Sequence, residues 1–232
     1  MRKKIISIGL MLVMSISLFG GCTRNRIVYT DYFRVQLRRS DGYAVVLELT
    51  ELGKEQEILA VPMFVERLPV RQIGRELRGM WGGIEGLYSP NLIKLYLPYT
   101  VSHVIDWGIA SEHIVEIIVM SMELPKRFFH FAWRDFYVVH YDYIHSCDTV
   151  RYISPSRPNV AFRYNYSNSP NQGYYWFDYV TGSNLYLTPP PTRQGYVFDG
   201  WYLDPQGTTP WDNQMPTTAE ENLRLYARWQ RV

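Results

Sequence analysis

Cysteine is scarce in this sequence, with 2 among 232 residues. A small scaffold held together by several disulfide bonds is therefore excluded, and the stability must come from hydrophobic cores. The sequence also lacks the motifs Gly-x-Ser-x-Gly and His-Glu-x-x-His, the phosphate-binding loop and the dinucleotide-binding fingerprint. We therefore expect a protein that is not an enzyme and that needs no cofactor.

An excess of positive charge is missing as well. The chain has 24 Lys and Arg against 22 Asp and Glu, and the basic residues are scattered along it. Removing residues 1–21, which hold three positive charges and no negative ones, brings the chain close to neutrality. Nucleic-acid binding depends on a field of clustered positive charge, so we expect no nucleic-acid partner.

The apolar run at the N-terminus is shorter than the roughly 20 residues that a spanning helix needs. It covers residues 5–19, is interrupted by serines and follows three basic residues. This pattern predicts a cleavable export signal over residues 1–21. The signal ends in Gly20-Gly21 and is followed by Cys22. These three residues resemble the lipobox of bacterial lipoproteins, although Phe19 stands where that family prefers leucine.

The lipobox resemblance implies that the thiol of Cys22 is acylated and that this residue becomes the new N-terminus. Its two or three acyl chains would hold the protein on a membrane. The chain is then an exported lipoprotein at the bacterial cell surface or envelope. Only Cys147 remains, so no intramolecular disulfide is available. The alternative is an ordinary signal-peptide cysteine that carries no lipid.

A change in composition after the Ser/Pro-rich residues 154–158 indicates two domains. The strand patterns of both domains predict a mainly β (α+β) protein. We predict four segments after the signal: a tether at residues 22–39, a first domain at 40–150, a linker at 151–158 and a second domain at 159–232.

A short apolar phrase recurs along the first domain at spacings of about 36, 22 and 20 residues. Its copies are Leu59-Ala60-Val61-Pro62, Leu95-Tyr96-Leu97-Pro98, Ile117-Ile118-Val119 and the weaker Tyr137-Val138-Val139. Such a period, with one insertion, is typical of a solenoid. Residues 61–74 and 91–105 resemble the BspA-like leucine-rich repeat, which implies one strand per repeat in a stacked sheet. Leu95 and Leu97, then Ile117 and Val119, would point into the core.

One such repeat cannot bury its apolar side alone, and three or four copies make a minimal array. We expect a hairpin of residues 43–49 and 57–61, joined by a charged turn, to cover one end of the array. A strand at residues 136–144 would cover the other end. The alternative is a generic α+β domain in which the repeated phrase arose by chance.

The second domain contains two segments with the alternation of half-buried strands, residues 195–202 and 223–229, joined by a turn-rich link. Gly200 inside the first pattern predicts a bulge or a close backbone approach. The ordered match of Gly195-Tyr196, Phe198 and Gly200-Trp201-Tyr202 with Leu225-Tyr226-Ala227 and Trp229 resembles the internalin-type B-repeat, also called the Listeria–Bacteroides repeat. The resemblance extends back to residue 159. It implies a small β-grasp-like module, found in bacterial surface proteins as a spacer or interaction unit.

Aromatic residues crowd one predicted hairpin of this domain, with neighbours on both faces. Some must form the core, because each large ring buries about 150–250 Å². By alternation, the exposed face carries either Tyr175, Phe177 and Tyr179 or Tyr174 and Trp176, and the pattern does not decide between them. These five residues are our candidates for stacking on a glycan or packing against a protein.

Only one cluster has the residue types that bind metals: His140, Asp142, His145 and Cys147. On a strand the first two and the last two lie on opposite faces, so we expect no metal site.

Four carboxylates are candidates for acid–base chemistry on a sugar: Glu48, Asp199, Asp204 and Asp212. Their positions in turns and on an exposed strand face favour solvated surface acids instead.

Together these patterns predict a membrane-anchored cell-surface lipoprotein that acts as a non-catalytic binding or adhesion module for a protein or glycan. The alternative is a structural spacer or assembly subunit of the bacterial cell envelope.

Overall fold

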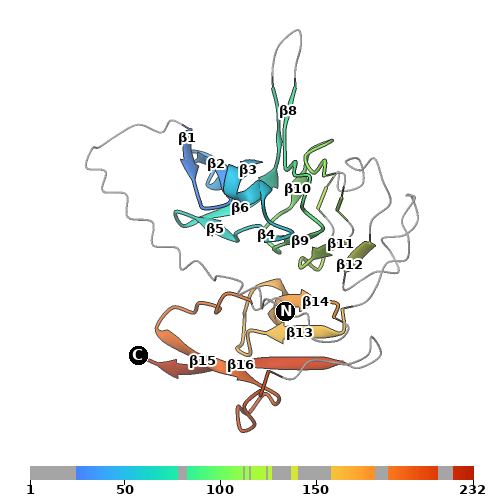
Figure 1. Ribbon diagram of the computed structural model, residues 1–232. Helices are drawn as coiled ribbons and strands as arrows, with labels where there is room; N and C mark the ends of the chain where they lie inside the picture. Colours follow the sequence, from blue (N-terminus) through green and yellow to red (C-terminus); the bar gives the residue numbers. More distant parts are fainter. Residues whose placement is uncertain are drawn as a thin grey trace.

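The computed structural model describes residues 25–77, 83–111, 113–114, 116–123, 125–126, 158–180, 188–213 and 222–232, together with the backbone of 137–140. This part of the chain is mainly β, as predicted (Figure 1). Within these ranges no helix is long and apolar enough to cross a membrane.

The first sheet, sheet A, combines an antiparallel N-terminal meander with two parallel strands. The meander pairs β1 with β2 and β2 with β3, and β6 and β10 continue the sheet parallel to β3. A short strand, β5, pairs with β6. The strands are β1 (Arg26–Tyr29), β2 (Phe33–Arg38), β3 (Tyr43–Leu49), β5 (Phe64–Val65), β6 (Leu68–Ile73) and β10 (His103–Val104).

The second sheet, sheet B, is entirely parallel and contains the recurring apolar phrase. Its strands are β4 (Ile58–Ala60), β9 (Lys94–Leu97), β11 (Glu116–Val119) and β12 (Tyr137–His140), in the order β12-β11-β9-β4. Leu59, Leu95 and Ile117 are direct partners across three of these strands. Leu95, Leu97, Ile117 and Val119 are all buried in the same core, as predicted.

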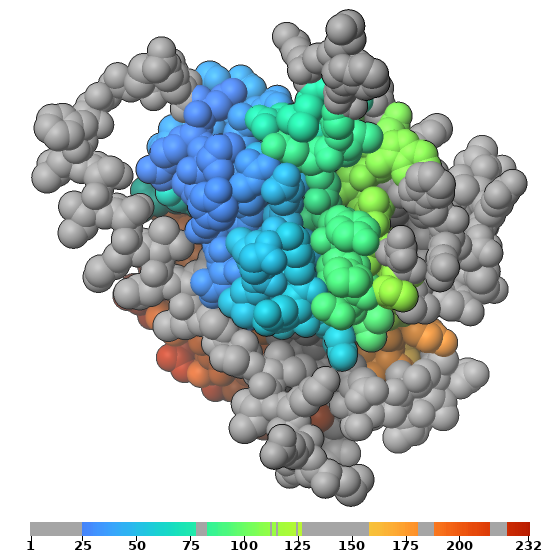
Figure 2. All heavy atoms as spheres, turned by 45° about the horizontal axis from the view of Figure 1, so that its top comes forward, coloured from blue at the N-terminus to red at the C-terminus, as the bar shows by residue number. Residues whose placement is uncertain are grey.

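The main core lies between the two sheets. Val35, Val46, Ile73 and Val104 occupy neighbouring positions across sheet A, and each is fully buried. They belong to one cluster with the inward-facing leucines and isoleucines of sheet B. In Figure 2 the N-terminal strands, in blue, and the later strands, in green, lie side by side in one continuous body.

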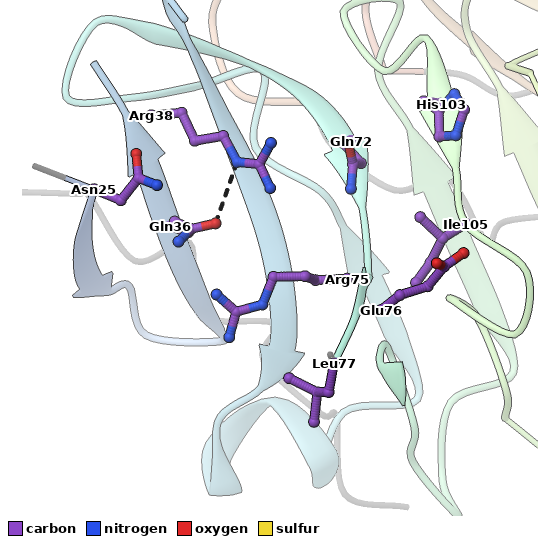
Figure 3. A pocket seen from close by; sticks show the side chains of 9 residues that line it. All are labelled: Asn25, Gln36, Arg38, Gln72, Arg75, Glu76, Leu77, His103 and Ile105. Carbon is purple, nitrogen blue, oxygen red and sulfur yellow. Dashed lines mark hydrogen bonds between the residues drawn. The ribbon is translucent and has the colours of Figure 1, made fainter. Parts of the chain in front are cut away.

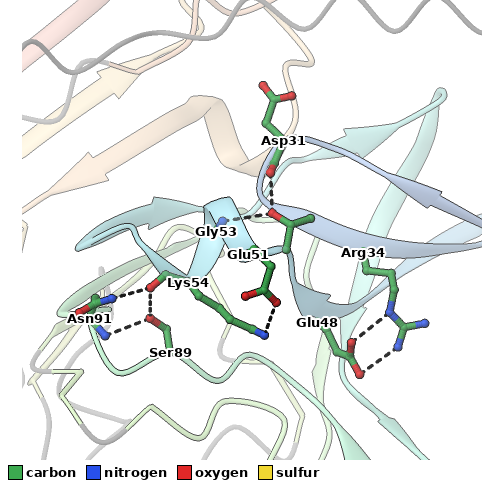
Figure 4. Close-up of polar contacts among 9 residues, drawn as sticks. Asp31, Arg34, Glu48, Glu51, Gly53, Lys54, Ser89 and Asn91 are labelled. Carbon is green, nitrogen blue, oxygen red and sulfur yellow. Dashed lines mark hydrogen bonds and ion pairs between the residues drawn. The ribbon is translucent and has the colours of Figure 1, made fainter.

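A short helix, α1 (Glu51–Lys54), carries the chain from sheet A to sheet B. Thr50 caps it by accepting a hydrogen bond from the Gly53 N–H, and the Lys54 carbonyl accepts hydrogen bonds from Ser89 Oγ and Asn91 Nδ2, both at 2.8 Å (Figure 4). The predicted hairpin of residues 43–49 and 57–61 is therefore wrong. Because the capped turn redirects the chain, β3 and β4 lie in different sheets.

The predicted tether is also wrong for residues 26–38. These residues form β1 and β2, and Phe33, Val35 and Leu37 belong to the main core. The alternation of these three apolar residues with Arg34, Gln36 and Arg38 gives β2 one buried and one polar face. A further two-stranded sheet pairs β7 (Arg75–Glu76) with β8 (Ile84–Glu85).

A third sheet contains the C-terminal strands in the order β14-β13-β16-β15. The central strands β13 and β16 are parallel, and each outer strand is antiparallel to its neighbour. The pairing of β15 with β16 shifts between Phe198 and Gly200, and Gly200 has a φ of +130°, so the predicted bulge is confirmed. The elements are β13 (Val160–Arg163), η2 (Asn171–Gly173), β14 (Tyr174–Asp178), β15 (Tyr196–Tyr202) and β16 (Leu223–Arg231).

The C-terminal sheet packs against the outer face of sheet B. Tyr96, Ile118 and Met120 form one buried cluster with Phe162 and Trp176. The ring centroids of Tyr96 and Trp176 are 5.0 Å apart. Sheet B consequently lies between two hydrophobic cores, below sheet A and above β13 and β14 in the view of Figure 1.

Polar contacts tie the two parts together at the same interface. Asp178 is completely buried. It accepts a hydrogen bond from Tyr96 Oη at 2.9 Å and forms an ion pair with Lys94 Nζ at 2.7 Å. Asn171 donates to the Met120 carbonyl at 2.6 Å and accepts from the Met122 N–H at 3.1 Å. The outer face of sheet B is therefore occupied by the chain itself.

Candidate functional site

The aromatic residues of β14 do not form an exposed binding face. The exposed fractions of Tyr175, Trp176 and Phe177 are 5%, 3% and 1%, while Tyr174 and Tyr179 are half-buried. Trp176 packs on Tyr96, and Tyr175 stacks on Trp201 with ring centroids 5.8 Å apart. Both alternatives from the alternation are therefore wrong, because neighbouring elements cover both faces of this strand.

The outer face of sheet A carries a polar groove instead (Figure 3). Gln36, Val45, Gln72 and His103 are direct partners across β2, β3, β6 and β10, so they form one row on this face. The hollow above the row has a volume of about 640 Å³, within the range of ligand pockets. It is lined by Asn25, Gln36, Arg38, Gln72, Arg75, Glu76, Leu77, His103 and Ile105.

Arg38 is held in place at one side of the groove by neutral groups. Its Nε donates to Gln36 Oε1 at 3.2 Å, and its Nη1 donates to Tyr43 Oη at 2.9 Å. The guanidinium also lies over the Tyr43 ring, 5.6 Å from the centroid. No carboxylate of the described residues lies within ion-pair distance of Arg38, so its charge is not neutralised locally.

Two amides complete the floor of the groove. Gln36 is only 7% exposed and uses its Oε1 to accept from Arg38, so its Nε2 remains as a donor. Gln72 donates from Nε2 to the Gly74 carbonyl at 2.8 Å, which leaves its Oε1 as an acceptor. Gly74 has a φ of +82°, and a Cβ there would lie 2.5 Å from Ile105 Cγ1, so only glycine fits.

The second arginine of the groove is neutralised. Arg75 pairs with Glu85 at 2.7 Å, and Glu85 also pairs with Arg34 at 2.6 Å. Burial favours the neutral acid, but the hydrogen bonds from the two arginines bring the pKa of Glu85 below its usual value. Hydrogen bonding and charge from Glu48 and Glu85 in turn raise the pKa of Arg34. This cluster holds β2, β7 and β8 together and leaves Arg38 as the uncompensated cation of the groove.

The four candidate acids do not converge on one site. Glu48 pairs with Arg34, Asp199 with Arg228, and Asp212 lies on the surface. Asp204 accepts hydrogen bonds from the Thr208 and Thr209 N–H groups, which lower its pKa to about 2. These contacts are those of structural and solvated acids.

Other predicted site residues lie outside the described side chains. These are the lipid-attachment residue Cys22 and the cluster His140, Asp142, His145 and Cys147; for His140 only the backbone, in β12, is described. Across the ranges that the structure describes, no group of three or more His, Cys, Asp or Glu residues is arranged to hold a metal ion.

Comparison with known families identifies the C-terminal part of the chain, where the four-stranded sheet β14-β13-β16-β15 lies. Residues 159–228 match the Listeria-Bacteroides repeat domain. The resemblance drawn from residues 195–202 and 223–229 is thereby confirmed for this part of the chain. The Listeria-Bacteroides repeat domain includes the buried aromatic strand β14 and the surface that covers sheet B.

A short stretch also matches a curated protein. Over 41 residues the chain is 44% identical to a protein of Evansella cellulosilytica named "Putative membrane protein". The matched stretch is 18% of this chain and 6% of that much longer relative. No solved structure matches the chain.

Proposed function

We propose that this protein is a membrane-anchored cell-surface lipoprotein that binds a protein or a glycan and catalyses no reaction. The observation that carries the proposal is the groove on sheet A, where an uncompensated arginine and two amides line a preformed hollow. The Listeria-Bacteroides repeat domain at residues 159–228 supports a location at the cell surface, as does the name of the matched protein. The residues Gly20-Gly21-Cys22 support the lipid anchor.

The proposed architecture is a short leucine-rich-repeat-like solenoid followed by a β-grasp-like module. The stacking of Leu59, Leu95 and Ile117 in adjacent parallel strands supports the solenoid. The order β14-β13-β16-β15, with parallel central strands, supports the β-grasp-like arrangement. In this architecture sheet A, and not sheet B, presents the binding surface, because the repeat domain covers sheet B.

Metabolic labelling with a fatty acid tests the anchor. The wild-type protein is expected to incorporate the label and to remain with the membrane fraction, whereas Cys22→Ala is expected to lose both. Cys147→Ala is the matched control and should keep the label. Equal labelling of wild type and Cys22→Ala would refute the lipid anchor.

A structural spacer or assembly subunit is the second candidate. It is favoured by the docking of the repeat domain on sheet B, which makes the two parts one packed body through Tyr96, Trp176 and Asp178. Glycan-array and pull-down screens on the purified protein separate the two functions. Ligand capture that is lost when Arg38 is replaced supports the binding module. Stable association with envelope proteins that is unchanged when Arg38 is replaced supports the spacer.

A further inference from the structure

We propose that the groove of sheet A binds the carboxylate groups of an acidic polysaccharide, with Arg38 as the residue that binds the anion. This inference rests on the proposed binding function and names the class of ligand for the same site. It starts from the contrast between Arg38 and the other arginines in or next to β1 and β2. Arg26 and Arg39 pair with Glu66, and Arg34 pairs with Glu48 and Glu85.

The guanidinium of Arg38 is prepared to receive an anion. Its Nε and Nη1 bonds to Gln36 and Tyr43 fix the plane of the group, and its remaining N–H donors are available to the groove. A planar guanidinium matches the two oxygens of a carboxylate, and hydrogen bonds between charged partners are about twice as strong as neutral ones. Because the side chain is already ordered, binding loses little rotamer entropy.

The remainder of the floor suits the hydroxyl groups of sugars. Gln36 Nε2 is a donor and Gln72 Oε1 an acceptor. The two amides stand two strands apart, which is roughly 10 Å at a strand spacing of about 4.8 Å. A donor and an acceptor at this separation can both contact an extended polymer that crosses the sheet.

The distribution of charge locates the anion at the Arg38 side. Glu76 also lines the groove, but Figure 3 places it on the opposite side, next to Ile105, while Arg38 lies beside Gln36. An acidic group is therefore attracted to the β2 side of the groove, where Arg38 lies.

Two observations favour a polysaccharide over a folded protein. The core of a protein interface is depleted of charge and enriched in aromatic residues, whereas only Leu77 and Ile105 of the lining are apolar. In addition, Asn25 lies at the edge of the groove, three residues after Cys22, a step of at most about 11 Å. With a lipid on Cys22, the groove opens near the bilayer, where a slender chain enters more easily than a globular partner.

The test uses the full-length protein in detergent and titration calorimetry with polygalacturonate, in which every sugar carries a carboxylate. Arg38→Gln is expected to weaken binding about tenfold or more, the loss typical of one charge-assisted hydrogen bond. Arg38→Lys keeps the charge but not the planar fork, and should weaken binding about threefold or more. Arg224→Gln, an exposed arginine of β16, is the matched control and should bind like wild type.

Two further polymers test whether binding needs both the carboxylate and the sugar. The methyl-esterified polymer has the same sugars without the charge and is expected to bind at least about tenfold more weakly. Poly-L-glutamate has carboxylates without sugars and is expected to bind more weakly than polygalacturonate. Equal binding by Arg38→Gln and Arg224→Gln, equal binding of the ester, or tighter binding of poly-L-glutamate would each overturn the proposal.

The failure of this inference can be distinguished from failure of the proposed function. Binding of a neutral glycan or an envelope protein that is lost in Gln72→Leu would overturn the acidic ligand and retain the binding function. Circular dichroism and thermal unfolding of each variant verify the fold. If Arg38→Gln does not fold, the comparison of Arg38→Lys with wild type decides, and equal binding by these two overturns the proposal.

Discussion

At the scale of single residues, Lys94 is the most consequential charge of the structure. Its ammonium lies 2.7 Å from Asp178 and 3.0 Å from Glu116, so one cation serves two carboxylates at the interface between sheet B and the repeat domain. Burial raises the pKa of Asp178 and of Glu116, and the nearby Lys94 only partly offsets this effect. Lys94 therefore offsets part of the burial penalty on both carboxylates.

Replacing Lys94 by methionine is expected to destabilise the protein by about 3 kcal/mol, because a buried carboxylate loses its partner. Asp178→Asn should cost less, since Lys94 keeps its contact with Glu116. Urea unfolding of both variants measures the difference. Lys54→Met, which removes an exposed pair with Glu51, is the control and should unfold almost like wild type. A smaller loss for Lys94→Met than for Asp178→Asn would contradict this account.

The same two acids predict a dependence of stability on pH. Their pKa values in the folded protein lie above the ordinary values of 3.8 and 4.5, so the folded state takes up protons first as the pH falls. Their contribution to stability is complete below the ordinary values and is lost as the pH rises through the raised ones. The free energy of unfolding of wild type minus that of Asp178→Asn should therefore increase from pH 7 towards pH 4.

Denaturant titrations of both proteins at several pH values give this difference. Asp204 and Glu85, whose pKa values are lowered, contribute with the opposite sign, but they are common to both proteins and cancel. A difference that stays constant or shrinks on acidification would show that Asp178 is not penalised by its burial.

At the scale of elements, the strands of sheet B are the part that the sequence predicts best. The phrases around Leu95 and Ile117 alternate into the core as expected. Their middle residues, Tyr96 and Ile118, are apolar although they point away from that core, and unbroken apolar runs are typical of strands buried on both faces. These apolar runs predict a second layer over sheet B, but they do not indicate which segment forms it.

Sheet A could be predicted only in part. The alternation of Phe33, Val35 and Leu37 with polar residues is a strand signal that the assignment of residues 22–39 to a tether overlooked. The groove itself needs four strands in register, and pairs such as Gln36 with Val45 and Gln72 with His103 are set by tertiary packing. The burial of Trp176 on both sides likewise depends on a contact between distant segments.

Tyr96 is the side chain that joins the two layers, so its replacement tests the interface. Tyr96→Ala is expected to destabilise the protein by about 3–5 kcal/mol, the range for loss of a large buried ring. Tyr96→Phe keeps the ring and loses the hydrogen bond to Asp178, at about 1 kcal/mol. Hydrogen exchange should show faster opening of β13 and β14 in the alanine variant alone. Equal exchange in both variants would mean that the ring does not hold the layers together.

At the scale of the whole molecule, the repeat domain serves as a cover for sheet B. A chain ending at residue 157 lacks this cover and exposes Tyr96, Ile118 and Met120 together. An apolar patch of this kind promotes association. We expect the shortened chain to form oligomers in size-exclusion chromatography and to bind a hydrophobic dye. Adding Tyr96→Glu and Ile118→Lys to the shortened chain should restore a monomer. If the shortened chain without these substitutions is monomeric and binds no dye, the repeat domain does not act as a cover.

The layered stacking of the three sheets also sets the order in which they would lie above a bilayer under the proposed lipid anchor. Packed sheets lie about 10 Å apart, so the C-terminal sheet stands roughly 20 Å beyond the groove floor, on the opposite side of the molecule. With the proposed lipid on Cys22, the groove faces inward, towards the envelope, and β15 and β16 face outward. In this proposed arrangement, one molecule binds a polymer on its membrane side and presents β15 and β16 of the repeat domain on the opposite side.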